Sequence, residues 1–123
     1  METNKDFEKI EMPILSRLSV AYELAHKLVF SFPKHERYAL GEKIENGLLQ
    51  AIELSIIGNG SNKYEKEKIL LKLNSKLELL KVLFRITLNC KIIEAKPYLE
   101  FSAKLQEIGK MTQGWIKYAR NMQ

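Results

Sequence analysis

The three prolines of this chain constrain its fold more than any other residues. Pro13, Pro33 and Pro97 each stand where a long run with helical spacing begins, and no such run has a proline in its middle. Proline suits the first turn of a helix because the N–H that it lacks would have no partner there. A fourth break, residues 57–62 (IGNGSN), combines glycines and asparagines, which commonly end helices.

These breaks predict four helices, at residues 14–30, 34–57, 63–91 and 97–121. Helices of similar length joined by short turns pack as an antiparallel bundle. The sequence therefore predicts an all-α fold, an antiparallel up-down four-helix bundle. We expect residues 13–123 to form this single domain, preceded by a polar segment at residues 1–12.

The composition argues against several other classes of protein. The 123 residues suffice for one hydrophobic core, and the longest apolar run is only a few residues, far short of a membrane span. The first residues are too polar for a secretory signal, and a single cysteine fits a reducing compartment. We therefore expect a cytoplasmic protein that does not bind membranes, with Cys90 as a small buried hydrophobe.

Positive charge is concentrated outside the N-terminal segment. Residues 1–12 hold two lysines and four acidic residues, whereas the rest of the chain holds 18 Lys and Arg against 11 Asp and Glu. The net charge of +5 would attract nucleic acid, anionic lipid or an acidic protein. A solvated helical surface explains the same composition equally well.

The third predicted helix is apolar on two sides. Beside its core stripe, a second row follows i, i+3, i+4, i+7 spacing: Leu79, Val82, Leu83 and Ile86. A helix that is apolar nearly all round must be buried nearly all round. One side of a lone bundle should face water, so we expect this row at or beside a subunit interface. The alternative is that the N-terminal segment folds over it.

Cations recur on the third and fourth predicted helices. Lys81 and Arg85 are four residues apart and repel each other mildly, which an acidic or polyanionic partner would reverse. They equally well extend from a buried flank into water. On the fourth helix Lys110 and Lys117 share a stripe, and Arg120 lies one turn beyond Lys117. The helix dipole alone favours cations in a last turn.

Metal-binding and catalytic patterns are missing from the sequence. His35 has no second histidine at ligand spacing, and residues 23–26 (Glu-Leu-Ala-His) supply one half of a di-iron motif that needs two. The glycines of residues 58–60 are not followed by the Lys-Ser/Thr of a phosphate loop. We therefore expect no catalytic residue, no metal and no cofactor, in a protein that is not an enzyme.

Two stretches carry a resemblance to a known family. They are residues 32–41 (FPKHERYALG) and residues 79–117, in which IGKM and GWIK are the most specific pieces. Both resemble the Avd-like four-helix bundle proteins, the accessory variability determinants of diversity-generating retroelements. The wider superfamily includes proteins encoded in ribosomal RNA intervening sequences, which share the first motif.

The resemblance implies a non-enzymatic homopentamer with a basic surface. It implies association with the retroelement's reverse transcriptase and binding of RNA and DNA without strong sequence preference. The cations that match the family's pattern are Lys34, Arg37, Lys81, Arg85, Lys110 and Lys117. Arg120, from the cluster on the fourth helix, completes the predicted binding set. The alternative is a stand-alone structural oligomer of the intervening-sequence type with no polymerase partner.

Overall fold

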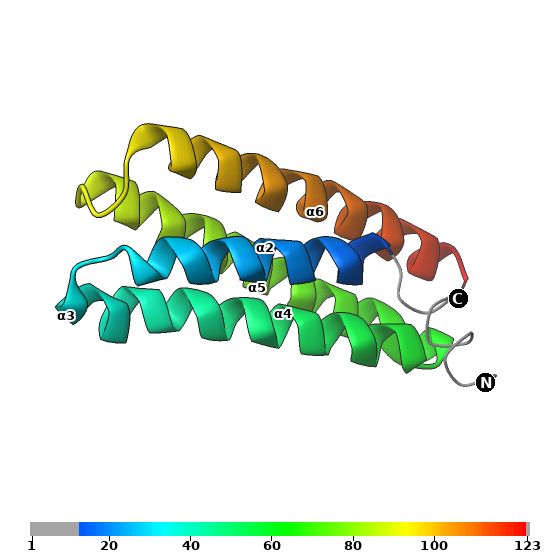
Figure 1. Cartoon of the computed structure of the whole chain (residues 1–123). Helices are drawn as coiled ribbons and strands as arrows, with labels where there is room; N and C mark the ends of the chain where they lie inside the picture. The colour runs from blue at the N-terminus through cyan, green and yellow to red at the C-terminus, as the bar shows by residue number, and fades with distance from the viewer. Residues whose placement is uncertain (1–12, 123) are drawn as a thin grey trace, which may run out of the picture.

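In residues 13–122, the part of the chain that the computed structural model describes, all regular secondary structure is helical (Figure 1). The four long helices are α2 (Pro13–Phe30), α4 (Glu42–Gly60), α5 (Lys63–Asn89) and α6 (Ala95–Asn121). A single helical turn, α3 (Lys34–Glu36), and a π-helical segment, η1 (Arg37–Gly41), join α2 to α4. The prediction of an all-helical chain with four long helices is confirmed. The predicted polar segment, residues 1–12, lies outside the described residues.

Each long helix runs back along the one before it. In Figure 1 the chain passes from right to left along α2, returns along α4, and repeats this path in α5 and α6. Arg120 at the end of α6 reaches Glu67 near the start of α5, whereas Tyr98 near the start of α6 meets Arg85. Because α2 and α5 each pack on both α4 and α6, the four helices enclose one core.

The core is built from one buried stripe on each helix. Leu18, Leu48, Leu77 and Leu105, one from each long helix, are fully buried. Burial of such a side chain contributes about 2 kcal/mol relative to leaving it in water. Toward the α5–α6 turn the stripe becomes aromatic, and the ring centroid of Phe84 lies 4.0 Å from that of Phe101. No side-chain polar atom buried within residues 13–122 lacks a hydrogen-bond partner.

Several helix boundaries differ from the sequence prediction: the predicted helix at 34–57 is divided into α3, η1 and α4, α2 begins one residue early, and α5 ends two residues early. Helix α6 begins at Ala95, so Pro97 is its third residue and not its first. Proline is tolerated there because the first-turn N–H groups have no acceptor within the helix. Helix α4 continues to Gly60, past the predicted end at residue 57. Lys66 of α5 satisfies the last carbonyl groups of α4, because its Nζ donates to the carbonyl oxygens of Gly58 (2.7 Å) and Asn59 (3.2 Å).

The π-helical segment η1 depends on a close approach to α2. A Cβ at Gly41 would lie 2.6 Å from Cγ1 of Val29 and 3.3 Å from the carbonyl oxygen of Glu36. Real Cβ atoms essentially never come this close to another heavy atom, so only glycine allows this packing. The close contact offsets the roughly 1 kcal/mol that a glycine costs in a helix.

We predict that Gly41→Ala lowers the free energy of unfolding by about 1–2 kcal/mol, because overpacking outweighs the better helix propensity of alanine. Gly114→Ala in α6 is the matched control, since a Cβ at Gly114 meets nothing within 4 Å. That control should raise stability by up to about 1 kcal/mol. Denaturant unfolding followed by circular dichroism, at one protein concentration, measures both. Equal shifts in the two variants would contradict the packing argument.

Helix α5 ends in a Schellman motif that places a lysine in a strained conformation. The N–H of Ile92 donates to the carbonyl of Thr87 (2.8 Å), and that of Lys91 donates to the carbonyl of Leu88 (2.9 Å). Lys91 adopts φ 58°, the left-handed region that favours glycine. Cys90 caps the helix and is exposed, so the expectation of a buried cysteine is wrong. The reason is that α5 ends at this position, so the Cys90 side chain does not continue the side of the helix that faces the core.

Lys91→Gly should stabilise the protein by about 0.5–1 kcal/mol. The left-handed strain of a side chain is removed, and the greater freedom of glycine in the unfolded chain cancels part of that gain. Lys91→Ala removes the same charge but keeps the Cβ, so it should bring no gain. Thermal or denaturant unfolding distinguishes the two variants; a gain in both would show that the charge, and not the backbone, matters.

Candidate nucleic-acid interface

Five of the seven predicted binding cations lie along the seam between α5 and α6. Three hydrogen bonds join α5 to α6 along this seam. Arg85 donates to the Tyr98 hydroxyl (3.3 Å), the Gln113 amide donates to Asn74 (2.9 Å), and Arg120 Nε donates to Glu67 (2.6 Å). Lys110 lies three residues before Gln113 on α6, and Lys117 lies four residues after it. Helix geometry therefore places all three on the same flank. We call Lys81, Arg85, Lys110, Lys117 and Arg120 the basic seam.

A shallow hollow of about 320 Å³ lies in the middle of the basic seam. Lys81 and Lys110 line it together with the side-chain amides of Asn74, Gln106 and Gln113, and with Glu78 and Gly109. Gly109 is buried, and a Cβ added to it would lie 3.5 Å from Lys81 Nζ. The ammonium group of an α5 residue therefore lies across the surface of α6. Amides and ammonium groups together can hydrogen-bond to phosphate and sugar oxygens.

Carboxylates neutralise only part of the basic seam. Lys81 pairs with Glu78 (3.1 Å) and Arg120 pairs with Glu67 (2.6 Å), both on the surface. The ion pairs found within residues 13–122 leave out Arg85, Lys110 and Lys117. Exposed ion pairs contribute only about 0–1 kcal/mol, so a phosphate can displace such a carboxylate at low cost. The seam thus keeps a positive charge.

The other two predicted cations, Lys34 and Arg37, lie elsewhere. Lys34 belongs to α3, which packs on η1, and Arg37 belongs to η1, which packs on α4 and α2. Lys34 is exposed, whereas Arg37 makes contacts within the chain: its Nε donates to the carbonyl oxygen of Phe32 (3.0 Å), and its guanidinium lies 4.9 Å from the ring centroid of Phe30. The structure therefore does not bring them together with the basic seam.

The second apolar row lies on another side of α5 than the one that faces α6, and its first member, Leu79, lies next to Leu54 of α4. Leu79, Val82 and Ile86 are 45%, 57% and 38% exposed, and Leu83 is half-buried against the core. A hollow of about 420 Å³ beside Leu79 is also lined by Leu54 of α4. Within the described part of the chain nothing covers these side chains. Helix α5 thus carries the apolar row on one flank and the cations Lys81 and Arg85 on the other.

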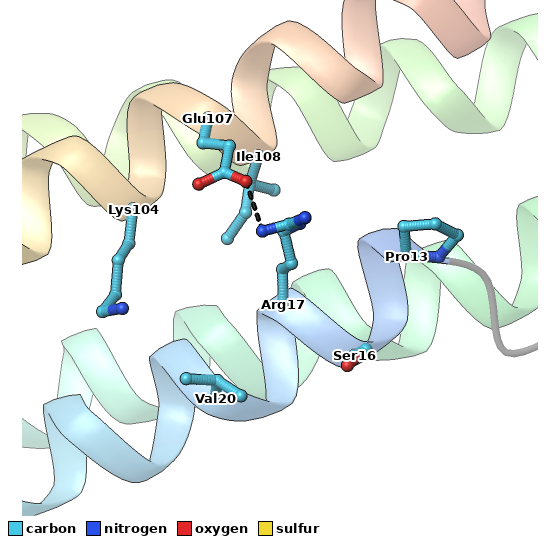
Figure 2. Close-up of a pocket in the computed structure, with 7 residues that line it drawn as sticks. All are labelled: Pro13, Ser16, Arg17, Val20, Lys104, Glu107 and Ile108. Atoms are coloured by element: carbon cyan, nitrogen blue, oxygen red, sulfur yellow. Dashed lines mark ion pairs between the residues drawn. The ribbon is translucent and has the colours of Figure 1, made fainter.

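The space between α2 and α6 is bridged by an ion pair. Figure 2 shows Arg17 of α2 and Glu107 of α6 pointing toward each other across a hollow of about 380 Å³, with Lys104 nearby. The Arg17 guanidinium is held by the Glu107 carboxylate, so an anion entering this hollow would have to compete with it. This hollow offers two cations, Arg17 and Lys104, against the five of the basic seam.

His26 and Lys66 make polar contacts within the chain. His26 stacks on Tyr22 and hydrogen-bonds to Glu45, and no group of three or more potential metal ligands occurs within residues 13–122. Burial lowers the pKa of Lys66, whose Nζ donates to the end of α4. No helix of the described chain has the length and apolar character to cross a membrane.

The spacing of the cations along each helix is visible in the sequence. The groups that surround these cations in the fold are not. The side-chain amides at positions 74, 106 and 113 carry no sequence signal, because solvated helices commonly contain Asn and Gln. The pairing of Arg120 with Glu67 joins residues 53 positions apart, which no local pattern predicts.

The fold and these surfaces place the chain in the class of small four-helix proteins. The sequence model of the bAvd-like family matches residues 12–119, and the chain belongs to this family. The resemblance to Avd-like proteins is thereby confirmed, and it links the chain to the accessory proteins of diversity-generating retroelements. No curated protein and no solved structure matches it.

Proposed function

We propose that this protein is a non-enzymatic accessory subunit of a diversity-generating retroelement, located in the cytoplasm. In this proposal it assembles as a homopentamer, associates with the reverse transcriptase, and binds RNA and DNA through the basic seam. The observation that carries the proposal is the alignment of five cations from α5 and α6, three of them without a carboxylate partner in residues 13–122. Membership in the bAvd-like family supports the retroelement context.

The dimensions of the basic seam suit a nucleic-acid backbone. Residues 98 to 120 of α6, the stretch from the partner of Arg85 to Arg120, extend about 33 Å at 1.5 Å per residue. About ten base-pair steps of a duplex cover the same length at 3.4 Å each. The seam is rich in ammonium and amide groups, and the ring of Tyr98, which lies on it, stacks on Phe84 of the core. Contacts from ammonium and amide groups bind phosphates and sugars and carry little sequence preference.

We predict that binding of structured RNA at about 50 mM salt weakens in Lys81→Ala/Arg85→Ala and in Lys110→Ala/Lys117→Ala. Each double variant should lower the slope of log affinity against log salt by about two, because counterion release scales with the phosphates neutralised. Gel retardation across a salt series gives both quantities. Lys27→Ala/Lys43→Ala removes the same charge from exposed positions on α2 and α4 and serves as the control.

Retardation of structured RNA by the wild-type chain is the first test of the proposal. If it fails to retard structured RNA at about 50 mM salt, the basic seam is not a nucleic-acid site. If the control weakens binding as much as the seam variants, only the net charge matters. Circular dichroism must show that each variant keeps its helical content, since surface substitutions typically change stability by less than about 0.5 kcal/mol.

The pentamer of this proposal rests on the apolar row of α5. Leu79 and Val82 are about half exposed in the single chain, and Leu54 continues the apolar surface onto α4. Contiguous exposed apolar patches commonly mark protein interfaces. Five copies around an axis would also present the basic seam five times, so weak binding by each chain becomes strong binding by the assembly.

We predict an assembly of about 72 kDa, five chains of 14.3 kDa, by light scattering at micromolar concentration. Leu79→Glu/Val82→Glu should dissociate it because two carboxylates would be buried at the interface. Both side chains are exposed in the single chain, so the helical content should not change. Val20→Glu, at a similarly exposed apolar position on α2, should keep the assembly. A wild-type mass near 14 kDa would contradict the prediction.

The alternative function is a stand-alone structural oligomer related to the intervening-sequence proteins. The exposed apolar row favours it as strongly as it favours the pentamer, because assembly alone would bury that row. The ion pairs that neutralise Lys81 and Arg120 also favour it. An assembly that forms but does not bind RNA would support this alternative.

A further inference from the structure

Another hollow, with distinct chemistry, lies where the end of α2 meets η1 and the start of α4. Its volume is about 410 Å³, and its lining includes Phe30, Arg37, Tyr38, Glu42 and Glu45. Phe30 and Tyr38 are each 71% exposed, as is Tyr64, and no other large apolar side chain of residues 13–122 exceeds this fraction. Two exposed rings beside one hollow offer a large apolar contact area that the fold itself does not use.

Contacts within the chain hold this hollow in shape. Arg37 is fixed by its hydrogen bond to the Phe32 carbonyl, and its guanidinium lies over the Phe30 ring. The π-helical turn η1 rests on α2 through the close approach of Gly41 to Val29. Tyr38 and Glu42, at the two ends of this turn, line the same hollow. Turns of π-helix recur at functional sites, and this one places a ring and a carboxylate together.

The charges of the lining favour a cationic ligand over an anionic one. The lining holds two carboxylates, Glu42 and Glu45, against the guanidinium of Arg37 and the imidazole of His26. The Phe30 ring and the Phe32 carbonyl already engage Arg37. Glu45 pairs with His26, whereas the ion pairs of the described residues leave Glu42 without a partner. A phosphate would be repelled by these carboxylates. A guanidinium or ammonium group would gain from both the carboxylate and the aromatic rings.

We propose that this hollow docks an arginine or lysine side chain from a basic segment of a protein partner. The proposal rests on the proposed function, because proteins that act on nucleic acids commonly carry basic segments. Docking and RNA binding would use different helix pairs, the hollow on α2 and α4 and the basic seam on α5 and α6. Both surfaces can therefore be occupied at once.

A short fluorescein-labelled peptide of alternating arginine and glycine provides the probe, and its citrulline analogue provides the uncharged control. The net charge of +5 opposes general attraction of a cationic peptide, so binding has to come from a local site. Fluorescence anisotropy should show that the arginine peptide binds more tightly than the citrulline peptide. Glu42→Gln should weaken binding about three- to fivefold, the scale of one exposed charge pair. Tyr38→Ala should have an effect of similar size.

Glu53→Gln is the matched control, because Glu53 is an exposed carboxylate on the same helix and lies outside the lining of the hollow. It should leave peptide binding unchanged. Equal loss in Glu42→Gln and Glu53→Gln, or equal binding of the two peptides, would overturn the proposal. A change of assembly mass in Phe30→Ala/Tyr38→Ala would overturn it too, because a second copy of the chain would then cover the hollow.

RNA retardation separates this proposal from the proposed function. Glu42→Gln should bind structured RNA as well as the wild-type chain does. If peptide binding fails while RNA binding persists, the docking site is wrong and the basic seam stands. Loss of RNA binding in Glu42→Gln would contradict the assignment of the two ligands to separate surfaces.

Discussion

The buried stripe of α5 determines where the cations and the exposed apolar side chains of that helix lie. Leu73, Leu77, Leu80 and Phe84 are fully buried, and they fix the rotation of the helix about its axis. Once that rotation is set, residues 81 and 85 have to point toward α6, and residues 79 and 86 toward α4 or outward. The basic seam and the apolar row are therefore two consequences of one packing constraint.

Much of the fold follows from the sequence because its signals are local. Prolines and the glycine–asparagine break placed four helices within a few residues of their observed bounds. The exceptions depend on contacts between distant residues. Helix α4 continues to Gly60 because a lysine eight residues beyond Gly58 satisfies its last carbonyls, and η1 forms where Gly41 meets Val29. No periodicity encodes such contacts.

The candidate site was predictable in part for the same reason. Spacing on one helix placed Lys81 beside Arg85, and Lys110 beside Lys117, and the structure brings the two pairs to one seam. Spacing could not show that Glu67 reaches across to Arg120, or that Arg37 is engaged with Phe30 and Phe32. Those interactions join residues of separate helical elements, so only the folded structure shows them. They determine which cations remain available to bind an anion.

The missing side chain at Gly109 couples two positions that local sequence does not relate. Lys81 belongs to α5, yet its ammonium group lies over α6 because nothing projects from Gly109 to displace it. An alanine at position 109 would only make ordinary contact with that ammonium group, whereas a longer side chain would compete for the space that the ammonium group occupies. Among relatives of this chain, positions 81 and 109 should therefore vary together where a side chain longer than that of alanine replaces the glycine.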